Sequence, residues 1–275
     1  MKSAATAARR TALAGFLRRL GGAAVAFSGG VDSAVLLLEA NAALGGRCIA
    51  VSARLAGTPP EDEADAASFC VSRGIRRVVV DFDELAVPGF ADNTPERCYL
   101  CKRALFAGLS SAAASAGFAT LCEGSNVDDR RDYRPGRRAL AELGVLSPLE
   151  ACGFTKADVR EIARDLGVPF AEKPASPCLA TRFAYGERIT RERLSAVAAA
   201  ERALCRLGCG RVRVRVHGAV ARIETDPGDF HVVTAAAGRI ADEFRRLGFV
   251  YTALDLRGYR TGSMNEVLRT AEDSP

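Results

Sequence analysis

The chain of 275 residues has no tryptophan, only two histidines, and no apolar run near the roughly 20 residues that a membrane-spanning helix requires. A membrane protein is therefore not expected. The two histidines, His217 and His231, stand late in the chain and far from any cysteine pair, so they are interpreted as structural or surface residues. Residues 1–20 are rich in arginine and contain no apolar stretch ending in a cleavage site. We expect an amphipathic opening helix, no signal peptide and a cytoplasmic location.

Lysine is also scarce, because only four of the 38 basic residues are lysines. The net charge of +5 is a mild excess that does not require nucleic acid as a partner. Arginine forks equally suit small molecules that carry phosphate.

Nine cysteines are an odd number, and without a secretion signal they do not indicate a disulfide framework. Most are expected to be small apolar packing residues. That group comprises Cys48, Cys70, Cys122, Cys152, Cys205 and Cys209. The cysteines left for chemistry are Cys98, Cys101 and Cys178.

Apolar strands and helices alternate through the first half of the chain. The pattern predicts strands at 23–27, 47–53, 76–82 and 119–123, with helices at 32–44, 60–73 and 99–116. Continuous apolar strands separated by helices indicate a parallel sheet covered on both faces. The expected fold class is therefore α/β, with a doubly wound domain over residues 1–180.

A proline-rich stretch at 168–186 separates this domain from a segment of different character. There the pattern predicts helices at 190–207 and 234–247 and strands at 211–216, 219–225 and 249–256. We expect residues 181–275 to form a smaller C-terminal α/β domain.

Residues 28–33 read Ser-Gly-Gly-Val-Asp-Ser, between a predicted strand and a predicted helix. Such a turn presents free backbone N–H groups and the positive end of a helix dipole to phosphate. Gly29 and Gly30 allow close backbone approach, Ser28 and Ser33 can donate to phosphate oxygens, and Asp32 can hold Mg²⁺ or cap the helix. The loop lacks the lysine and the spacing of a Walker A motif. It resembles the PP-loop of ATP pyrophosphatases, which split ATP into AMP and pyrophosphate; the alternative is a turn that only caps a helix.

Ligands of parallel sheets bind at the carboxyl ends of the strands. The sequence therefore predicts that the PP-loop, residues 52–54, Glu84 and residues 123–126 converge at one edge, with Ser52 beside the adenine. Residues 124–136 carry the carboxylates Asp128, Asp129 and Asp132, which suit Mg²⁺ and ribose contacts or form an ordinary polar turn.

Cys98 and Cys101 form a CxxC at the start of a predicted helix, where thiol pKa values fall and soft metals bind. On its own this pattern is a redox pair or half of a zinc site. Cys178 follows a proline near Lys173 and Arg182, which would lower its pKa, or it is a buried turn cysteine. The three thiols together suggest a [4Fe–4S] cluster with one iron that lacks a protein ligand and can hold sulfide.

Arg211, Arg213 and Arg215 alternate along a predicted strand and so share one face. They form either a solvated outer face or a clamp for a substrate phosphate, with Glu224 on the next strand to balance them.

Several segments in order along the chain resemble the LarE family, ATP-dependent sulfur transferases that act in biosynthesis of the nickel-pincer cofactor of lactate racemase. The matching segments are SGGVDS at 28–33, RCYLCKRALF at 97–106, GSNVDDRRDYRPG at 124–136, KPASPCLATRFAYGERIT at 173–190, RVRVH at 213–217 and DLRGYRTGSMNE at 255–266. The resemblance implies adenylation of a carboxylate of a pyridinium biscarboxylate mononucleotide, after which sulfur displaces AMP to leave a thiocarboxylate.

The resemblance also implies roles for individual residues. The ATP site is expected to comprise residues 28–33 with Ser52, Arg54, Gly124, Ser125, Asn126 and Asp128. Arg182, Arg213 and Arg215 would bind the substrate phosphate, and Asp32 and Glu224 would hold Mg²⁺. The catalytic residues would be Cys178, Lys102 and Glu201.

The family has two sulfur strategies. In one, a single loop cysteine at the position of Cys178 gives up its own sulfur. In the other, three cysteines hold a [4Fe–4S] cluster whose extra sulfide is the donor, and Cys98 and Cys101 favour this form by ligand count. A homo-oligomer is expected by resemblance, with a sulfide or sulfur donor as partner.

Two rival interpretations remain at the level of sequence. A tRNA-thiolating enzyme also combines a PP-loop with three cysteines, but it would need an RNA-binding surface. A non-catalytic adenine-nucleotide-binding redox sensor would use the CxxC as a disulfide switch.

Overall fold

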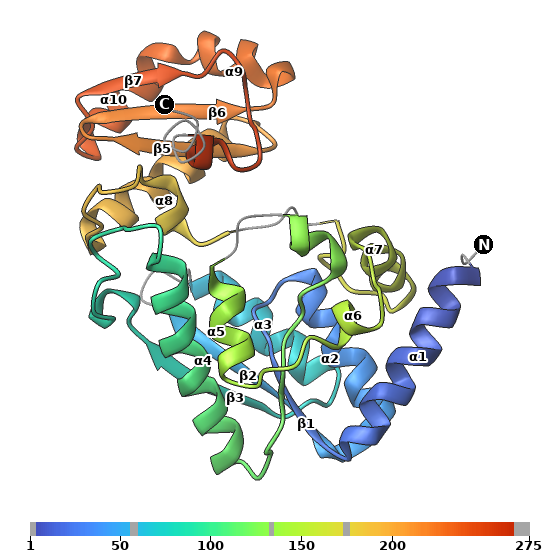
Figure 1. Ribbon diagram of the computed structural model, residues 1–275. Helices are drawn as coiled ribbons and strands as arrows, with labels where there is room; N and C mark the ends of the chain where they lie inside the picture. Colours follow the sequence, from blue (N-terminus) through green and yellow to red (C-terminus); the bar gives the residue numbers. More distant parts are fainter. Residues whose placement is uncertain (1–3, 56–59, 132–134, 173–176, 267–275) are drawn as a thin grey trace, which may run out of the picture. The chain divides into compact units, whose positions relative to one another are not determined.

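The computed structural model describes residues 4–55, 60–131, 135–172 and 177–266 of the chain (Figure 1). It divides into two compact units. The first comprises Met1–Val87 with Cys98–Ala175, and the second comprises Pro88–Arg97 with Ser176–Pro275.

The first unit is built on a four-stranded sheet of order β3-β2-β1-β4 in which all paired strands are parallel. Its strands are β1 (Ala23–Ala26), β2 (Cys48–Leu55), β3 (Arg77–Phe82) and β4 (Leu121–Cys122). Its helices are α1 (Ala4–Leu20), α2 (Val31–Leu44), α3 (Pro60–Ser72), α4 (Arg97–Ser115), α5 (Gly136–Glu142), α6 (Pro148–Ala151) and α7 (Lys156–Asp165). The predicted parallel α/β architecture is confirmed.

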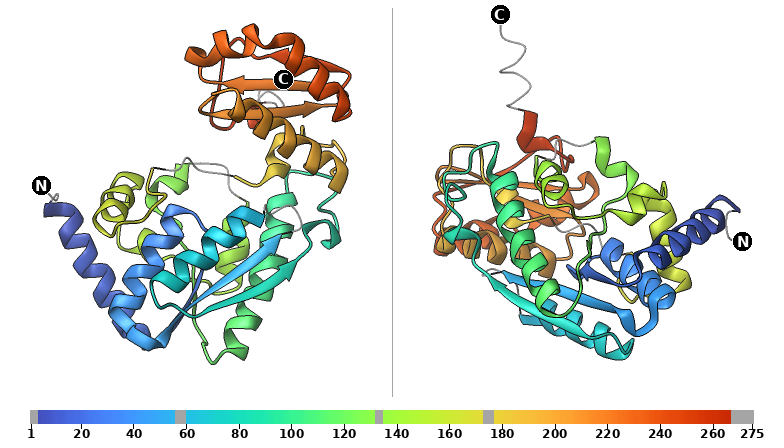
Figure 2. Two further views of the ribbon diagram at one scale, coloured as in Figure 1. Left: turned by 180° about the vertical axis from the view of Figure 1, so that it is seen from behind. Right: turned by 60° about the horizontal axis from the view of Figure 1, so that its bottom comes forward.

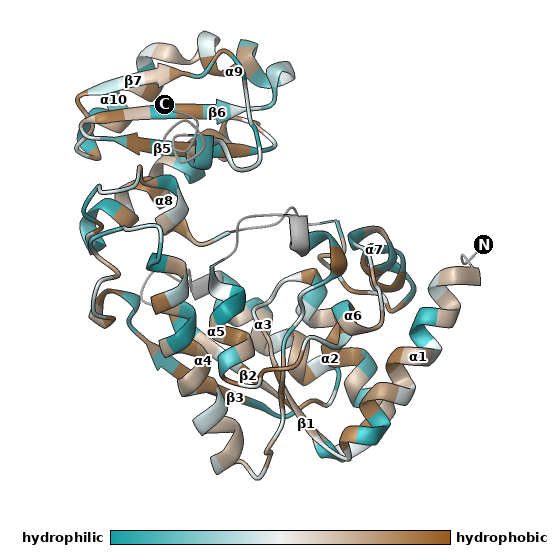
Figure 3. Ribbon diagram, in the orientation of Figure 1, coloured by the Kyte–Doolittle hydropathy of each residue, from teal (hydrophilic) through white to brown (hydrophobic). Residues whose placement is uncertain are grey.

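Side chains of successive residues in β1 enter different cores, because strand residues alternate between faces. Ala23 and Val25 pack with residues of α1, α2 and α7, whereas Ala24 packs with residues of α4 and α5. Helices therefore cover both faces of the sheet, as the views of this unit in Figure 2 also show. Figure 3 shows mixed hydrophilic and hydrophobic bands along α1 and α7, consistent with the burial of Leu13 and Ile162 on their inner sides.

Helix α7 was not anticipated from the sequence. It begins with a capping box, in which the Thr155 hydroxyl accepts from the Asp158 backbone N–H and the Thr155 N–H donates to the Asp158 carboxylate. Its apolar side buries Val159 and Ile162 beneath α2.

The second unit has a three-stranded sheet, with β5 antiparallel to β6 and β6 parallel to β7. The elements are β5 (Val212–His217), β6 (Val220–Thr225), β7 (Tyr251–Leu254), α8 (Arg191–Arg206), α9 (Phe230–Ala235) and α10 (Ala237–Arg246). Val212, Val214 and Val216 are buried, and α8 packs on β5. The alternate residues Arg213 and Arg215 therefore project to the opposite face of the sheet.

Among the residues that the structure describes, no helix combines the length and apolar character needed to cross a membrane.

Candidate functional site

The PP-loop connects β1 to α2 as expected. Gly29 has a φ of +74°, in the left-handed region where glycine is favoured, and Gly30 directly precedes the first turn of α2. The Ser33 hydroxyl donates to the Gly30 carbonyl at 2.9 Å and accepts from the Ser28 backbone N–H at 3.2 Å. The loop is thus held from within, while Ser28 and Gly30 remain exposed.

The segment after β4 packs directly on the PP-loop. A Cβ added at Gly124 would lie 2.9 Å from the Ser33 backbone nitrogen, so only glycine allows this approach. Asn126 is buried, and its side-chain amide donates to Asp32 Oδ1 at 3.1 Å. Two of the predicted segments therefore do meet at one edge of the sheet.

Lys156, the first residue of α7, lies at the candidate site and was not singled out from the sequence. Its ammonium group forms an ion pair with Asp32 Oδ2, and its backbone N–H donates to Asp128 Oδ2 at 2.8 Å. The signal that could have found it is the Thr155-Lys156-Ala157-Asp158 capping pattern, which places a lysine in the first turn of a helix. The N-cap of α2 is Gly30, so Asp32 does not occupy the capping position considered for it.

Ser52 supports the strand that leads into the PP-loop. It is 2% exposed, and its hydroxyl donates to the Phe27 carbonyl at 2.8 Å and accepts from Arg77 Nε at 2.9 Å. Arg54 is exposed and pairs with Asp81 at 3.0 Å. The proposed adenine contact of Ser52 stays a prediction.

Other residues expected near the nucleotide lie close to the ends of β3 and β4. Glu84 follows β3 and is 5% exposed. Glu123 is also buried, and it accepts hydrogen bonds from the hydroxyl of Ser125 at 2.8 Å and from the hydroxyl of Ser147. The hydroxyl of Ser125 is therefore engaged by Glu123. The side chain of Asp128 is exposed to solvent.

The CxxC occupies the first turn of α4. Cys98 and Cys101 are both half-buried and stand three residues apart, which places them on one side of the helix. Lys102 follows, and its stem packs over Gly136, where an added Cβ would come within 2.5 Å of Lys102 Cδ.

Most cysteines expected to be structural are removed from solvent. Burial raises the pKa of Cys48 and of Cys122 to about 12, so both stay protonated. Burial also raises the pKa of Cys70, Cys152, Cys205 and Cys209. Cys205 nevertheless lies on the exposed side of α8, where packing does not account for it.

In the second unit, Arg182 is a buried side chain whose donors are engaged by the protein itself. It forms a two-pronged ion pair with Glu201, at 2.8 and 3.1 Å. Its third nitrogen, Nη1, donates to the Pro177 carbonyl at 3.0 Å and to the Thr181 hydroxyl at 2.9 Å. Arg182 therefore holds the backbone of the loop that presents the exposed Cys178.

The same loop is held at two further points that the sequence did not suggest. Arg97 is 4% exposed and donates to the Ala180 carbonyl at 2.8 Å and to the side chain of Asn93. Asn93, at a φ of +52°, donates to the Ala184 carbonyl at 2.6 Å. Side chains of segment 88–97 therefore hold the backbone that directly follows Cys178.

Arg215 and Glu224 form a buried ion pair on the polar face of the second sheet. Arg215 donates to the Glu224 carboxylate at 2.9 Å, and Glu224 is fully buried. Glu224 also accepts from the Ser263 hydroxyl at 2.7 Å and pairs with Arg222 at 3.2 Å. Its carboxylate is thus already surrounded by donors, while its predicted Mg²⁺ role stays a prediction.

Arg213 lies beside this pair and over the ring of Tyr259, with 5.6 Å from its guanidinium carbon to the ring centre. Burial and the neighbouring charges of Arg182 and Arg215 lower the pKa of Arg213, against the opposing effects of Glu201 and Tyr259. A cation destabilised in this way favours a bound anion.

The three thiols predicted to share a cluster are divided between the units, Cys98 and Cys101 in the first and Cys178 in the second. Within the described ranges, no group of three or more His, Cys, Asp or Glu side chains is gathered as a metal site. The cluster therefore stays a prediction. Lys173 and Asp132 lie outside the described residues.

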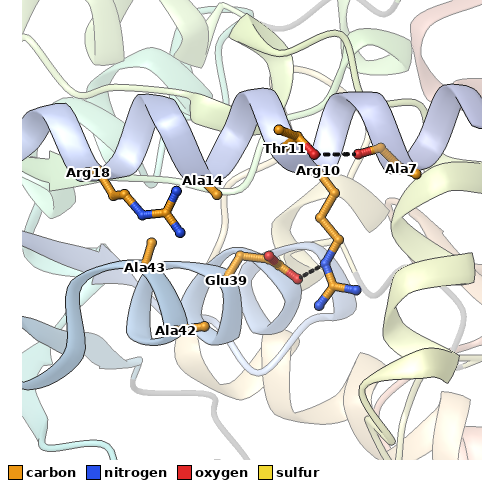
Figure 4. Close-up of a pocket in the computed structure, with 8 residues that line it drawn as sticks. All are labelled: Ala7, Arg10, Thr11, Ala14, Arg18, Glu39, Ala42 and Ala43. Atoms are coloured by element: carbon orange, nitrogen blue, oxygen red, sulfur yellow. Dashed lines mark hydrogen bonds and ion pairs between the residues drawn. The ribbon is translucent and has the colours of Figure 1, made fainter.

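A separate groove lies between α1 and α2 (Figure 4). Half of its lining residues are alanines, and across it Arg10 Nε donates to Glu39 at 2.7 Å. No motif singled out from the sequence contributes to this groove, so no chemistry is assigned to it.

No protein-family model matches the chain. A curated protein of Lactiplantibacillus plantarum, named pyridinium-3,5-bisthiocarboxylic acid mononucleotide synthase, is 36% identical over 273 residues, which cover 98% of each chain. The chain belongs to the LarE family.

Other relatives extend the same match. An uncharacterized protein of Synechocystis is 41% identical over 255 residues, covering 92% of this chain and 95% of its own. An uncharacterized protein of Methanocaldococcus jannaschii is 28% identical over 237 residues, covering 86% and 90%. LarE enzymes use ATP, in agreement with the PP-loop and the parallel sheet that carries it.

Proposed function

We propose that this chain is an ATP-dependent sulfur transferase that converts a carboxylate of pyridinium-3,5-biscarboxylic acid mononucleotide into a thiocarboxylate. The observation that carries the proposal is the 36% identity to the synthase over 98% of both chains. The PP-loop geometry supports the ATP-binding part of the proposal.

The chemistry explains why ATP is needed. A carboxylate oxygen is too poor a leaving group for sulfur to displace. Attack of the carboxylate on the α-phosphorus of ATP releases pyrophosphate and forms an acyl adenylate. A sulfur nucleophile then adds to the acyl carbon and expels AMP, which leaves the carbon bonded to sulfur.

The first unit supplies the nucleotide end of this reaction. Backbone N–H groups of the PP-loop and the start of α2 can absorb negative charge on the phosphates. Mg²⁺ would neutralise phosphate charge, and the carboxylate Asp32 at the loop is a donor of the type it prefers. Gly124 lets the segment after β4 pack against the PP-loop, and Asn126 holds the Asp32 carboxylate by a hydrogen bond.

The second unit supplies the substrate phosphate site. Arg182 and Arg215 already have carboxylate partners, Glu201 and Glu224. Arg213 has the lowered pKa and stands at the centre of the cationic face. We assign Arg182, Arg213 and Arg215 to phosphate binding, and the ion pairs of Arg182 and Arg215 also hold the surrounding structure.

For the sulfur source, Cys98, Cys101 and Cys178 would hold a [4Fe–4S] cluster. Two thiolates at positions three apart on one helical turn fit such ligation. The cluster supplies an iron without a protein ligand at which sulfide can bind. We place Lys102 near the activated acid, with Glu201 holding Arg182, and expect a homo-oligomer.

The proposal is tested by incubating the anaerobically reconstituted protein with ATP, Mg²⁺ and the biscarboxylate mononucleotide. Pyrophosphate release and a product in which one oxygen is replaced by sulfur are both expected. ATP binding without any pyrophosphate release would contradict the proposal and favour a nucleotide-binding sensor. Tight, salt-sensitive tRNA binding together with thiolated tRNA would favour the RNA-modifying alternative.

A further inference from the structure

The ion pair between Lys156 and Asp32 joins the PP-loop to a helix that begins more than a hundred residues later in the chain. Both oxygens of the Asp32 carboxylate are engaged by neighbouring side chains. Oδ1 accepts from the Asn126 amide at 3.1 Å, and Oδ2 faces the Lys156 ammonium. The carboxylate expected to meet Mg²⁺ is therefore bound to a side-chain cation instead.

The two partners differ in how firmly they are held. The backbone of Lys156 is fixed by its bond to Asp128 and by the Thr155 capping box. Its side chain is 28% exposed and that of Asp32 is 25% exposed, so water reaches the pair. Ion pairs that water reaches are weak, and a long lysine stem can turn away without moving the helix.

We propose that Lys156 is a positioning residue that occupies Asp32 until Mg²⁺ arrives and then turns to the negative polyphosphate. The inference rests on the proposed function, because it takes Mg²⁺ and ATP as the ligands of the loop. A divalent ion and a lysine ammonium repel one another, so they do not share one carboxylate oxygen. A released ammonium finds a new partner in the polyphosphate that enters with the metal.

The first experiment measures metal binding to the full chain without nucleotide. Mg²⁺ is titrated by calorimetry, and Mn²⁺ serves as a paramagnetic probe of the same site. Lys156→Met keeps the apolar stem and removes the competing charge, so affinity for either ion is expected to rise by about threefold or more. Asp32→Asn is expected to abolish the binding.

A matched control lies on the same helix. Arg164 pairs with Glu172 at 2.6 Å, and both are exposed. Arg164→Met removes an ion pair of the same kind near the other end of α7. Its metal affinity is expected to equal that of the unchanged protein, and circular dichroism of each variant checks that α7 is retained.

The second measurement is the KM for ATP in pyrophosphate release. Lys156→Met is expected to raise this KM by about tenfold, because the polyphosphate loses a charged partner. Lys156→Arg should restore much of the loss. Metal affinity that stays the same or falls in Lys156→Met would overturn the inference. Because that titration needs neither ATP nor the acid, it separates this failure from a failure of the proposed function.

Discussion

Single buried arginines organise the second unit through backbone carbonyls as well as through carboxylates. Arg182 bonds to the carbonyl of Pro177, Arg97 to that of Ala180, and Arg215 to that of Thr181 at 3.2 Å. A guanidinium has five N–H donors in a fixed plane, so it can satisfy a carboxylate and a loop carbonyl together. The position of Cys178 therefore depends on cations that need not touch the substrate.

Arg182→Met tests how much the ion pair between Arg182 and Glu201 contributes to stability. The variant leaves Glu201, whose side chain is 15% exposed, without its main partner, and we expect a loss of about 3 kcal/mol in unfolding free energy. Urea denaturation measures the loss. The double variant Arg182→Met with Glu201→Met removes both charges and should recover part of it. Equal or greater loss in the double variant would contradict the ion-pair explanation.

The sequence indicated several of these residues but not their partners. The alternating Arg211-Val212-Arg213-Val214-Arg215 pattern predicted a shared face, and the register pairs Arg213 with Glu224. It could not show that Arg182 turns inward to Glu201, because that contact depends on how α8 packs against residues 179–182. Asn93 and Arg97 carried no signal, since the backbone carbonyls that they bond lie 91 and 83 residues away along the chain.

The junction between strand and helix at the PP-loop depends on one close approach. Gly124→Ala would push a methyl group against the backbone of Asp32 and Ser33, at 3.0 and 2.9 Å. We expect a loss of about 2 kcal/mol in unfolding free energy and a higher KM for ATP. Gly108→Ala is the control, because the same change in α4 meets nothing within 4 Å. It should stabilise the protein by about 0.5–1 kcal/mol, and a similar loss in both variants would refute the argument.

Helices α1 and α7 are tied through Asp158. Burial would raise the pKa of this carboxyl, but hydrogen bonds from Thr155 and Thr6 and the charge of Arg9 together lower it below its ordinary 3.8. A carboxyl with a lowered folded pKa stabilises the protein above its unfolded pKa, and this contribution is lost as pH falls through the folded value.

Asp158→Asn is therefore expected to lower the free energy of unfolding by about 1–2 kcal/mol at pH 7. The difference from the unchanged protein should shrink as pH falls from about 4 toward 3. Urea denaturation at a series of pH values measures it. Asp242→Asn, at an exposed position of α10, is the control and should show no such trend. A difference for Asp158→Asn that is constant with pH would contradict the assignment.

Buried helices and strands were largely predictable from the sequence, and partly exposed helices were less so. The strand at 47–53 and the helix at 32–44 were found as β2 and α2 with shifts of one or two residues, because apolar periodicity marks buried elements clearly. The helix expected at 234–247 is divided into α9 and α10 at Ala236. α7 was missed because the polar Lys156-Ala157-Asp158 start masks its apolar side.

The chain as a whole contains two compact units, and the residues of the proposed reaction are distributed over both. The PP-loop and the CxxC belong to the first, and the arginine face and Cys178 belong to the second. Neither unit alone carries the full set. Sulfur transfer is accordingly a property expected of the complete chain.

The source of the sulfur determines whether thiols of both units or only Cys178 take part in the transfer. With a cluster, the anaerobically reconstituted protein should absorb near about 400 nm and turn over repeatedly when sulfide is supplied. Cys98→Ala and Cys101→Ala should each lower iron content and turnover together, because both thiols stand on the same turn of α4. Cys152→Ala is the matched control, since it removes a half-buried thiol of the same unit that lies outside the predicted set, and it should change neither quantity.

Intact mass before and after a single turnover gives the decisive comparison. If a cluster holds the sulfide, the polypeptide mass stays constant, because no side-chain bond breaks. If Cys178 is the donor, its Cβ–Sγ bond breaks, and the protein loses the mass of H₂S as the residue becomes dehydroalanine. That loss of mass, together with unchanged iron content and turnover in Cys98→Ala and Cys101→Ala, would contradict the cluster. The sulfur would then come from Cys178, which is consumed once per chain.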